Sequence, residues 1–412
     1  MSGRSALARD AEPRPRLRLV HPGEAAPRGA RAAAEAGTRR TVLLLLGSTG
    51  LLVLAGLVMV LSASSVSASA RFGDPFRYFQ RQAAYALVGV GALVLTSRMR
   101  YAAWQRLCVP LLLLTLALLV LVLHPSAGVA AYGSSRWLSL GPVTIQPSEL
   151  AKLALVAFTA AVLTRKWGRL DRLGHLALPL LPVLLLVAAL VMLQPDLGTT
   201  VIITGTVFLM LYVAGVRLRY LLAGGLAGFV AGVILIFSAD YRRVRFLAFL
   251  DPWADATNTG YQLVQSLIAL GSGGWFGVGL GASRQKWLYV PNAHTDFIFS
   301  ILGEELGLVG EIVILAAFAA LVLAGIRVAA RAPDVFGRLL AAGIVGWFGL
   351  QTLVNLGAVT GLLPITGVPL PFLSYGGSAL VVSLAAVGIL WSIARAPTGA
   401  ARATRRGGGR GS

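Results

Sequence analysis

Residues 293–307 read Ala-His-Thr-Asp-Phe-Ile-Phe-Ser-Ile-Leu-Gly-Glu-Glu-Leu-Gly, and they carry three acids from a long polar stretch into a long apolar one. The acids are Asp296, Glu304 and Glu305. A carboxylate at a membrane edge costs free energy unless it has a partner or a chemical role, so acids in this place are functional candidates. We therefore predict that Asp296 is the catalytic base of a membrane enzyme.

The composition around this segment is that of a membrane protein. Of 412 residues, 57% are hydrophobic and only 13% are charged, and the mean hydropathy is +0.77. These values exclude an ordinary soluble domain and indicate a chain that crosses the membrane several times. The net charge of +20 would suggest nucleic acid in a soluble protein, but the positions of the charges explain it better, so no nucleic-acid partner is expected. The single cysteine, Cys108, allows no intrachain disulfide.

Apolar runs predict an all-α polytopic protein with ten transmembrane helices, since about 20 apolar residues cross the hydrocarbon core. The runs are 41–62, 82–97, 102–123, 147–164, 174–193, 197–215, 219–238, 297–325, 336–360 and 371–394. They form one transmembrane domain, 41–395. Residues 1–40, with nine arginines and no hydrophobic periodicity, predict a disordered basic arm, and residues 396–412 predict a disordered basic tail.

Lysine and arginine positions orient these spans. With the N-terminal arm in the cytoplasm, inner segments hold 25 of the 36 Lys and Arg residues and outer segments hold 9. Both termini are therefore expected in the cytoplasm. The largest outer segment is then the loop 238–296 between the seventh and eighth spans, in which Tyr261–Leu270 predicts a helix with one apolar face.

Polar groups cluster where the even-numbered spans begin at the outer surface. Prolines 147, 195 and 371 mark three such starts, because proline suits a first helical turn and an acid there satisfies free backbone N–H groups. For Asp196, a capping role and a substrate-binding role are equally open. Glu149 and Lys152 share one face of the fourth span, and we expect them to line a polar cavity that positions substrate. A pair that only fixes helix packing is the alternative.

The outer loop also carries five cations, at 242, 243, 245, 284 and 286, where the positive-inside rule would deplete them. We predict that Arg243 and Lys286 contact a phosphorylated substrate, although lipid head groups would also suit them. His294 lies two residues from Asp296 and is expected to be a hydrogen-bonding loop residue. No complete metal site is readable, so a divalent cation such as Mg²⁺ or Mn²⁺ stays an open possibility.

Five motifs in order resemble the SEDS family (shape, elongation, division and sporulation proteins), over about residues 42–395. They are Gly133–Leu138, Gln146–Lys152, Gln194–Thr199, Ala293–Phe299 with Gly303-Glu304-Glu305, and Pro371–Ser378. Residues 284–291, Arg-Gln-Lys-Trp-Leu-Tyr-Val-Pro, are similar to the cell-division branch, FtsW. Residues 365–372 depart toward the elongation branch, RodA.

The resemblance implies a ten-span peptidoglycan glycosyltransferase of the bacterial plasma membrane that polymerises lipid II on the outer leaflet. It implies a class B penicillin-binding protein as partner, with other division proteins at the septum. Asp296 matches the family's essential aspartate, Glu149 and Lys152 match polar cavity residues, and Trp137 matches a sensitive loop tryptophan. Arg136, Asp196, His294 and Ser374 lie in the matching motifs and are further substrate-site candidates.

The reaction expected from this resemblance is one inverting transfer, because lipid II has an α-linked pyrophosphate and the product bond is β-1,4. It needs a base for the acceptor hydroxyl, which we assign to Asp296, and positive charge for the departing pyrophosphate. Three alternatives are a lateral-wall polymerase, a lipid II flippase and a noncatalytic scaffold. A flippase should need polar residues through the whole membrane depth, whereas here the acids lie at outer helix starts.

Overall fold

The computed structural model describes residues 28–125, 128–131, 134–141, 143–169, 173–287, 289–291 and 293–396. Its elements are, in order, α1 (Arg28–Phe72), α2 (Arg77–Arg98), α3 (Ala103–Leu121), β1 (Gly128–Ala131), β2 (Ser134–Leu140), β3 (Val143–Ile145), α4 (Pro147–Arg165), the 3-10 turn η1 (Trp167–Arg169), α5 (Leu173–Met192), α6 (Leu197–Val213), α7 (Leu218–Phe237), α8 (Asp240–Leu250), α9 (Tyr261–Ser272), α10 (Ile298–Arg331), α11 (Val335–Val359) and α12 (Gly377–Ala394). The predicted disorder of residues 1–27 and 397–412 lies outside the described residues.

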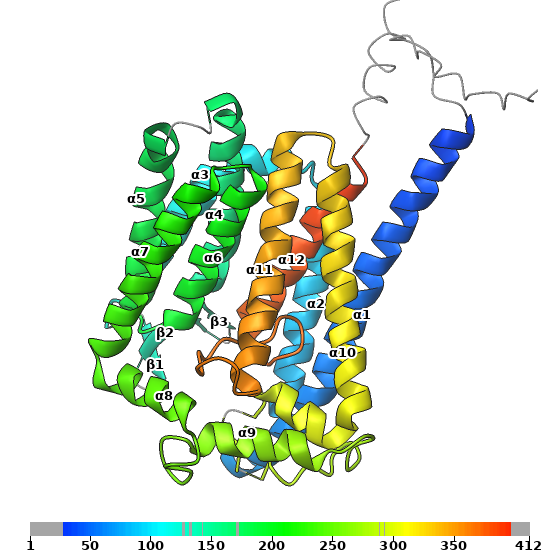
Figure 1. The fold of residues 1–412 in the computed structure, drawn as a ribbon. Helices are drawn as coiled ribbons and strands as arrows, with labels where there is room; N and C mark the ends of the chain where they lie inside the picture. The colour runs from blue at the N-terminus through cyan, green and yellow to red at the C-terminus, as the bar shows by residue number, and fades with distance from the viewer. Residues whose placement is uncertain are drawn as a thin grey trace, which may run out of the picture.

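Every predicted apolar run coincides with a helix, and these helices run side by side in one bundle (Figure 1). Among the described residues, seven helices are long and apolar enough to cross a membrane: α1, α3, α4, α7, α10, α11 and α12. The apolar parts of α5 and α6 are shorter, and α2 does not reach the same hydropathy. The structure thus supports a helical protein with several membrane spans and leaves the predicted count of ten unconfirmed.

Both ends of the described chain differ from expectation. Helix α1 starts at Arg28, so the predicted disorder does not hold for residues 28–40; this stretch contains five alanines, which favour helix. At 45 residues, α1 is roughly 68 Å long and exceeds the ~30 Å hydrocarbon core. Figure 1 shows the start of α1 and the end of α12 at the same end of the bundle.

Helix α12 begins at Gly377 and not at the predicted residue 371. Residues 360–376, here named the α11–α12 loop, contain Pro364, Pro369 and Pro371, and proline removes the backbone N–H groups that a helix needs. Pro371 therefore marks no helix start. In contrast, Pro147 occupies the first turn of α4 as predicted.

A small sheet that the sequence analysis did not predict lies between α3 and α4. Strands β1, β2 and β3 form a three-stranded antiparallel sheet in that order. The backbone of Thr144 in β3 joins the sheet to two helices: its N–H donates to the Tyr85 hydroxyl at 3.2 Å, and its carbonyl accepts from Ser378 Oγ at 3.1 Å. The sheet is therefore fixed to α2 and to the start of α12.

Helix α11 is central to the packing, because it contacts α4, α6 and α10. Helix α12 lies closely along α2, where a Cβ on Gly89 would collide with Leu384 and one on Gly388 would collide with Thr96. Most of α4 is buried, whereas α7 has no buried residue. The interior of the bundle is thus built around α4 and α11, and α7 presents apolar side chains outward.

Helix α10 is broken near its start, at Gly307, whose φ of 64° is in the region that favours glycine. The break exposes backbone groups that pair with the glycine-rich segment after α9. Leu308 N–H donates to the Gly274 carbonyl, and Val278 N–H donates to the Glu304 carbonyl, both at 2.9 Å. The loop 238–296 is therefore ordered around α8 and the predicted helix α9, and it packs against the first turns of α10.

Candidate active site

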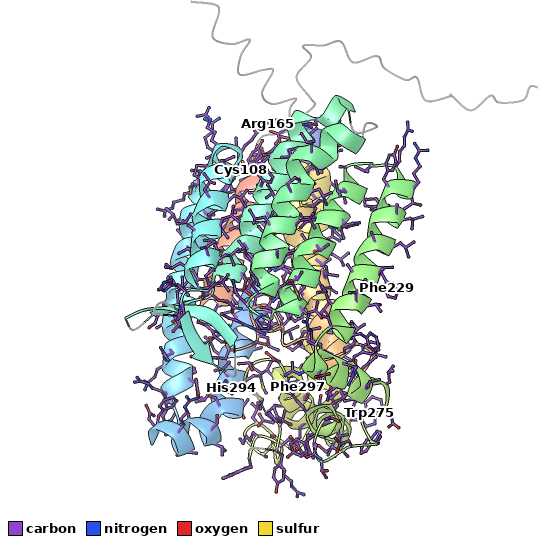
Figure 2. All side chains as sticks on the ribbon, turned by 90° about the vertical axis from the view of Figure 1, so that its left-hand side faces the viewer. Cys108, Arg165, Phe229, Trp275, His294 and Phe297 are labelled. Carbon is purple, nitrogen blue, oxygen red and sulfur yellow. The ribbon has the colours of Figure 1, made fainter. Side chains whose placement is uncertain are left out.

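The predicted acids and cations meet at one end of the bundle. Figure 2 shows His294 and Phe297 at the end opposite Arg165 and Cys108. Asp296 directly precedes α10, and its neighbours come from the sheet, from the start of α6, from α8 and from the α11–α12 loop. Segments far apart in the sequence therefore build this site.

Asp296 is partly exposed, and it is held through its backbone. Its carbonyl accepts a hydrogen bond of 2.9 Å from Asn355 Nδ2. Its Oδ2 faces Gly367, where a Cβ would come within 3.5 Å. Burial raises the pKa of Asp296 from 3.8 to about 6; the charge of Asp196 also raises the pKa, while the charges of Arg136 and Arg245 lower it. A carboxyl with this pKa is ionised at neutral pH and remains a usable base.

Arg136 joins the sheet to the start of α6. Its Nε donates to the Gln194 carbonyl at 3.0 Å, a second guanidinium nitrogen donates to the Pro195 carbonyl, and the third lies 3.9 Å from Asp196 Oδ2. Asp196 caps α6, because Oδ1 accepts from Thr199 N–H at 3.0 Å and Oδ2 accepts from Thr199 Oγ1 at 2.9 Å. The capping role of Asp196 is confirmed, and its substrate role stays a prediction.

Glu149 and Lys152 form the predicted pair on α4. Lys152 Nζ lies 2.8 Å from Glu149 Oε1, and both side chains are only 2% exposed. Two residues of α11 complete the cluster: Lys152 Nζ donates to Gln351 Oε1 at 2.8 Å and lies 5.1 Å from the centre of the Trp347 ring. The pair is therefore real and deeply buried. Whether it lines a cavity that admits substrate stays a prediction.

His294 belongs to an aromatic cluster. Its ring centre lies 4.7 Å from that of Tyr78 at the start of α2 and 5.6 Å from that of Tyr375, and the Tyr375 N–H donates to the His294 carbonyl at 2.9 Å. Burial lowers the pKa of His294 to about 4, so the imidazole is neutral at pH 7. Burial raises the pKa of Tyr375. The cluster fixes the backbone just before Asp296.

Glu304 and Glu305 are buried in α10, and each has several partners. Glu304 accepts from Ser283 Oγ at 2.5 Å and from the Arg284 N–H at 2.9 Å. Glu305 accepts from Ser62 Oγ at 2.6 and 2.7 Å and lies 3.6 Å from Lys286 Nζ. Lys286, a predicted phosphate ligand, is itself 7% exposed. These two acids thus fasten the loop 238–296 and α1 to α10.

Three other predicted site residues lie around this centre. Trp137 is partly buried in β2 next to Arg136, and successive strand residues point to opposite faces, so Trp137 lies on the other face of the sheet. Arg243 is exposed on α8 and lies 3.5 Å from Asp240 Oδ1. Ser374 is buried, and its hydroxyl accepts from the Leu370 N–H at 2.8 Å within the α11–α12 loop.

Buried polar atoms without a hydrogen-bond partner among the described residues concentrate near these groups. Those near the site belong to Ser148, Glu149, Gln194, Thr352, Asn355 and Thr366, and others lie elsewhere in the described chain. An unpaired buried polar group costs about 1–3 kcal/mol, so such a concentration indicates a region that takes up water or a polar ligand. Sequence reasoning missed Gln351 and Asn355, although two amides four residues apart in an apolar span could have signalled them.

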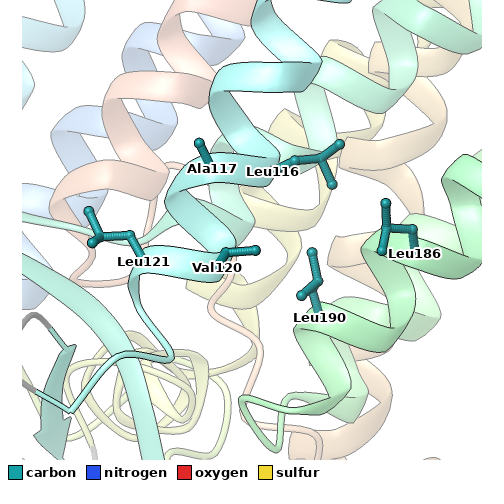
Figure 3. Close-up of a pocket in the computed structure, with 6 residues that line it drawn as sticks. All are labelled: Leu116, Ala117, Val120, Leu121, Leu186 and Leu190. Carbon is teal, nitrogen blue, oxygen red and sulfur yellow. The ribbon is translucent and has the colours of Figure 1, made fainter.

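The described part of the chain also has an apolar groove of about 470 Å³ between α3 and α5 (Figure 3). It is lined by Leu116, Ala117, Val120, Leu121, Leu186 and Leu190. No side chain among these can hydrogen-bond, so the groove suits hydrocarbon and does not suit a sugar or a phosphate.

A resident metal ion does not fit the described residues. Among them, no three His, Cys, Asp or Glu side chains lie together as a metal site would require. Asp196, whose charge acts on Asp296, already uses both oxygens on Thr199. The chemistry of this donor set therefore assigns no step to a metal ligand of the protein.

The sequence matches the family model FtsW/RodA/SpoVE, described as cell cycle protein, over residues 42–398. It is 48% identical to the probable peptidoglycan glycosyltransferase FtsW of Geobacter metallireducens, over 82% of this chain and 90% of that protein. It is 44% identical to stage V sporulation protein E of Bacillus subtilis, over 86% of this chain and 96% of that protein.

Two solved structures have a similar fold. One comes from a study of the structural coordination of polymerization and crosslinking by a peptidoglycan synthase complex; its TM-score is 0.70 at 32% identity, over 85% of this chain and 96% of that chain. The other is the rod shape determining protein RodA of Thermus thermophilus, with a TM-score of 0.64 at 30% identity, over 86% of this chain and 96% of that chain.

Proposed function

The chain belongs to the FtsW/RodA/SpoVE family of cell cycle proteins, and we infer from this premise that it is a peptidoglycan glycosyltransferase. The predicted SEDS resemblance is thereby confirmed. The names of its relatives support a polymerase of the FtsW type, which acts in cell division. The substrate that follows from this activity is lipid II, a disaccharide linked through pyrophosphate to a polyprenyl chain.

The reaction needs two things from the protein: a base that takes the proton of the acceptor hydroxyl, and positive charge that stabilises the departing pyrophosphate. The attacking oxygen forms the new β-1,4 bond while the bond between the sugar and the pyrophosphate breaks. The proton passes to the base, and the pyrophosphate leaves with the electron pair. One displacement inverts the α-linked donor.

We assign the base to Asp296. The single observation that carries this assignment is geometric: the carboxyl group is partly exposed, and its Oδ2 faces Gly367 of the α11–α12 loop. Burial also raises its pKa to about 6. A base is most effective when its pKa lies near the working pH. Three buried acids at this end, Asp196, Glu304 and Glu305, are occupied by hydrogen bonds or ion pairs.

Arg136 and Arg245 are the cations best placed to stabilise the pyrophosphate. Their charges act on Asp296, so they lie close enough to influence a group bound beside it. Arg136 is held by three contacts at the start of α6 and can offer charge without much reorganisation. Arg245 is exposed on α8 and fits the part of the substrate nearer the solvent better than Arg243 does, since Arg243 lies beside Asp240.

Partner, membrane topology and location complete the proposal. The similar synthase complex, in which polymerization and crosslinking are coordinated, supports a crosslinking partner for this chain, which we take to be a class B penicillin-binding protein. The placement of α1–α7 and α10–α12 at the ten apolar runs supports ten spans. The distribution of Lys and Arg supports both termini in the cytoplasm. The FtsW-type relatives support a place at the division septum with other division proteins.

The test is polymerisation of lipid II by the purified protein with its partner in detergent. The wild type should form glycan polymer, and Asp296→Asn should lose about 10²–10⁴-fold in rate, as expected for loss of a general base. Asp251→Asn is the matched control, because Asp251 is an exposed aspartate of the same outer loop. Near-normal polymer from Asp296→Asn would remove Asp296 as the base.

Detergent also separates the enzyme from a flippase, because no membrane is present to cross. Polymer from the wild type requires covalent chemistry, whereas a flippase or a scaffold would leave lipid II unchanged. A septal position of the tagged protein in dividing cells would support the division role. An even distribution along the lateral wall would favour the elongation role.

A further inference from the structure

We propose that Gln351 and Asn355 of α11 are positioning residues for the transfer, and that the buried Glu149–Lys152 pair acts through Gln351 and not by touching substrate. The proposal rests on the function inferred above. It concerns how the backbone of Asp296 and the α11–α12 loop are held in fixed positions relative to each other. Neither amide takes part in a chemical step.

Asn355 joins the two segments that flank the reactive carboxylate. Its Nδ2 donates to the Asp296 carbonyl at 2.9 Å and to the Val368 carbonyl at 2.8 Å. A side-chain amide has two N–H groups, so this nitrogen uses its full donor capacity on two carbonyls that lie 72 residues apart in the sequence. The side chain is 2% exposed, which excludes competition from bulk water.

Gln351 lies one helical turn before Asn355 and repeats the arrangement. Its Nε2 donates to the Pro369 carbonyl at 2.7 Å. Its Oε1 accepts from Lys152 Nζ at 2.8 Å and from Trp347 Nε1 at 2.7 Å. Because two donors face the oxygen, the amide can point only its nitrogen toward Pro369. Lys152 and Trp347 thus set the direction of a hydrogen bond that they do not themselves make.

The three α11 residues at positions 347, 351 and 355 form one stripe, since residues four apart share a helix face. It covers about 12 Å along the axis at 1.5 Å per residue, from the buried ion pair to the backbone of Asp296. Two consecutive carbonyls of the α11–α12 loop, at 368 and 369, are fixed to this stripe. The next residue toward the N-terminus, Gly367, faces the Asp296 carboxylate.

The buried pair has no described contact outside this arrangement that would reach a substrate. Both side chains are only 2% exposed, and the described partners of Lys152 are Glu149, Gln351 and the Trp347 ring. A lysine so enclosed cannot meet a pyrophosphate without a large rearrangement. Its position instead suits a fixed charge that orients the Gln351 amide.

The experiment measures lipid II polymerisation by the purified complex at varied lipid II concentration, with thermal unfolding followed on each variant. Asn355→Leu keeps a similar volume and removes both donated hydrogen bonds. Gln351→Glu keeps the acceptor for Lys152 and removes the donor to Pro369. Each should lower kcat about 10–100-fold with KM changed less than about twofold, because a misplaced base slows the chemical step after binding.

Thr159→Val is the matched control, since Thr159 is buried in α4 about two turns beyond Lys152 and its hydroxyl has no partner among the described residues. It should keep kcat and KM. Asn355→Gln, which restores an amide on a longer stem, should recover part of the lost kcat. Lys152→Met combined with Gln351→Glu should be no slower than the worse single variant, because both act on one hydrogen bond.

Two kinetic results would overturn the proposal. A raised KM with normal kcat in Lys152→Met would make Lys152 a substrate contact. The other result is variants of Gln351 and Asn355 whose activity falls only in proportion to the folded fraction. If Asn355→Leu does not fold, Gln351→Glu decides by the same measure. If the wild type forms polymer and these variants are equally active, the positioning proposal fails and the proposed function stands. If the wild type forms no polymer, the proposed function and the positioning proposal both fail.

Discussion

Asp296 and the Glu304–Glu305 pair come from one short motif, yet the fold gives their carboxylates opposite surroundings. Glu304 and Glu305 are 2% and 0% exposed, and hydroxyl, backbone N–H or ammonium groups face them. Asp296 is partly exposed, and its main tie to the fold is through its backbone carbonyl. Sequence proximity therefore does not imply a shared role.

The difference shows how to separate a structural acid from a chemical one. An ionised carboxylate has about four acceptor sites, and one whose sites are filled by the protein has no capacity left to take a proton from a ligand. Glu304 and Glu305 use their oxygens to hold the outer loop and α1 against the broken start of α10. Asp296 has fewer partners: a side-chain hydrogen bond from Thr295 reaches its carboxylate, whose Oδ2 faces Gly367, and burial raises its pKa to about 6.

The largest effect expected from this contrast is in Asp296→Asn, which should lower the polymerisation rate by about 10²–10⁴-fold without lowering thermal stability. The amide fills the same space, and it removes a carboxylate that burial disfavours. Rate and unfolding temperature measured on one preparation check both parts. A variant that loses activity together with its fold would place Asp296 with the structural acids.

Glu305→Ala should show the reverse, a loss of about 3 kcal/mol of stability, because it leaves Lys286 buried without its anionic partner. Ser62 in α1 loses its acceptor at the same time. Denaturation of the detergent-solubilised protein measures the loss. At a temperature where the variant remains folded, activity per folded molecule should stay within a few-fold of wild type. Normal stability in Glu305→Ala would contradict the structural role.

The dependence on pH should follow Asp296 alone. Its pKa is about 6 in the fold, so activity should rise as pH rises through 6 and should fall about tenfold per unit below it. Because the folded pKa is above the ordinary 3.8, this group favours folding below about pH 4, and that contribution is lost as the pH rises through about 6. Asp296→Asn should remove this pH dependence of stability. If the acid limb of the pH profile, the fall in activity on its acidic side, lies at another pH, a different group is the base.

Much of the site could be predicted from the sequence, because its strongest signals are local. The Glu149–Lys152 pair follows from a spacing of three on a helix, and the cap at Asp196 follows from an acid directly after Pro195. Apolar runs located every long helix of the bundle, although length and hydropathy alone single out only seven of the described helices as spans.

The parts that could not be predicted depend on contacts between distant segments. Nothing local in Asn355 indicates that it bonds to residue 296, and Arg136 reaches Asp196 only because the unpredicted sheet sits over α6. The predicted start of α12 at residue 371 was wrong, because Pro371 follows other loop prolines and does not begin a helix. The sequence does not show that Lys286 pairs with Glu305, because the two meet only where the loop before α10 folds back onto that helix.

A smaller effect is expected from Gly367→Ala, which adds a methyl group 3.5 Å from Asp296 Oδ2 at a residue with φ of 70°. The positive φ costs an alanine about 1–2 kcal/mol, and relief of that strain should shift the loop beside the carboxylate. We expect a several-fold loss of kcat. Gly361→Ala is the control, since Gly361 has φ of 75° in the same loop and faces Leu263 instead. Equal kinetic losses in the two variants would mean that strain alone matters.

The smallest effect separates two arginines on α8. Both Arg243 and Arg245 are exposed, but Arg243 lies beside Asp240, whereas the charge of Arg245 lowers the pKa of Asp296. Arg245→Gln should therefore move the acid limb of the pH profile upward, with a change in rate at pH 7 of about twofold or less, since exposed charges contribute ~0–1 kcal/mol. Arg243→Gln should leave the limb in place.

The shift of the acid limb in Arg245→Gln should be larger at 0.1 M salt, where charges act over about 10 Å, than at 1 M, where they act over about 3 Å. A limb that moves equally in both variants would show that the general positive charge of α8, and not the place of Arg245, acts on Asp296.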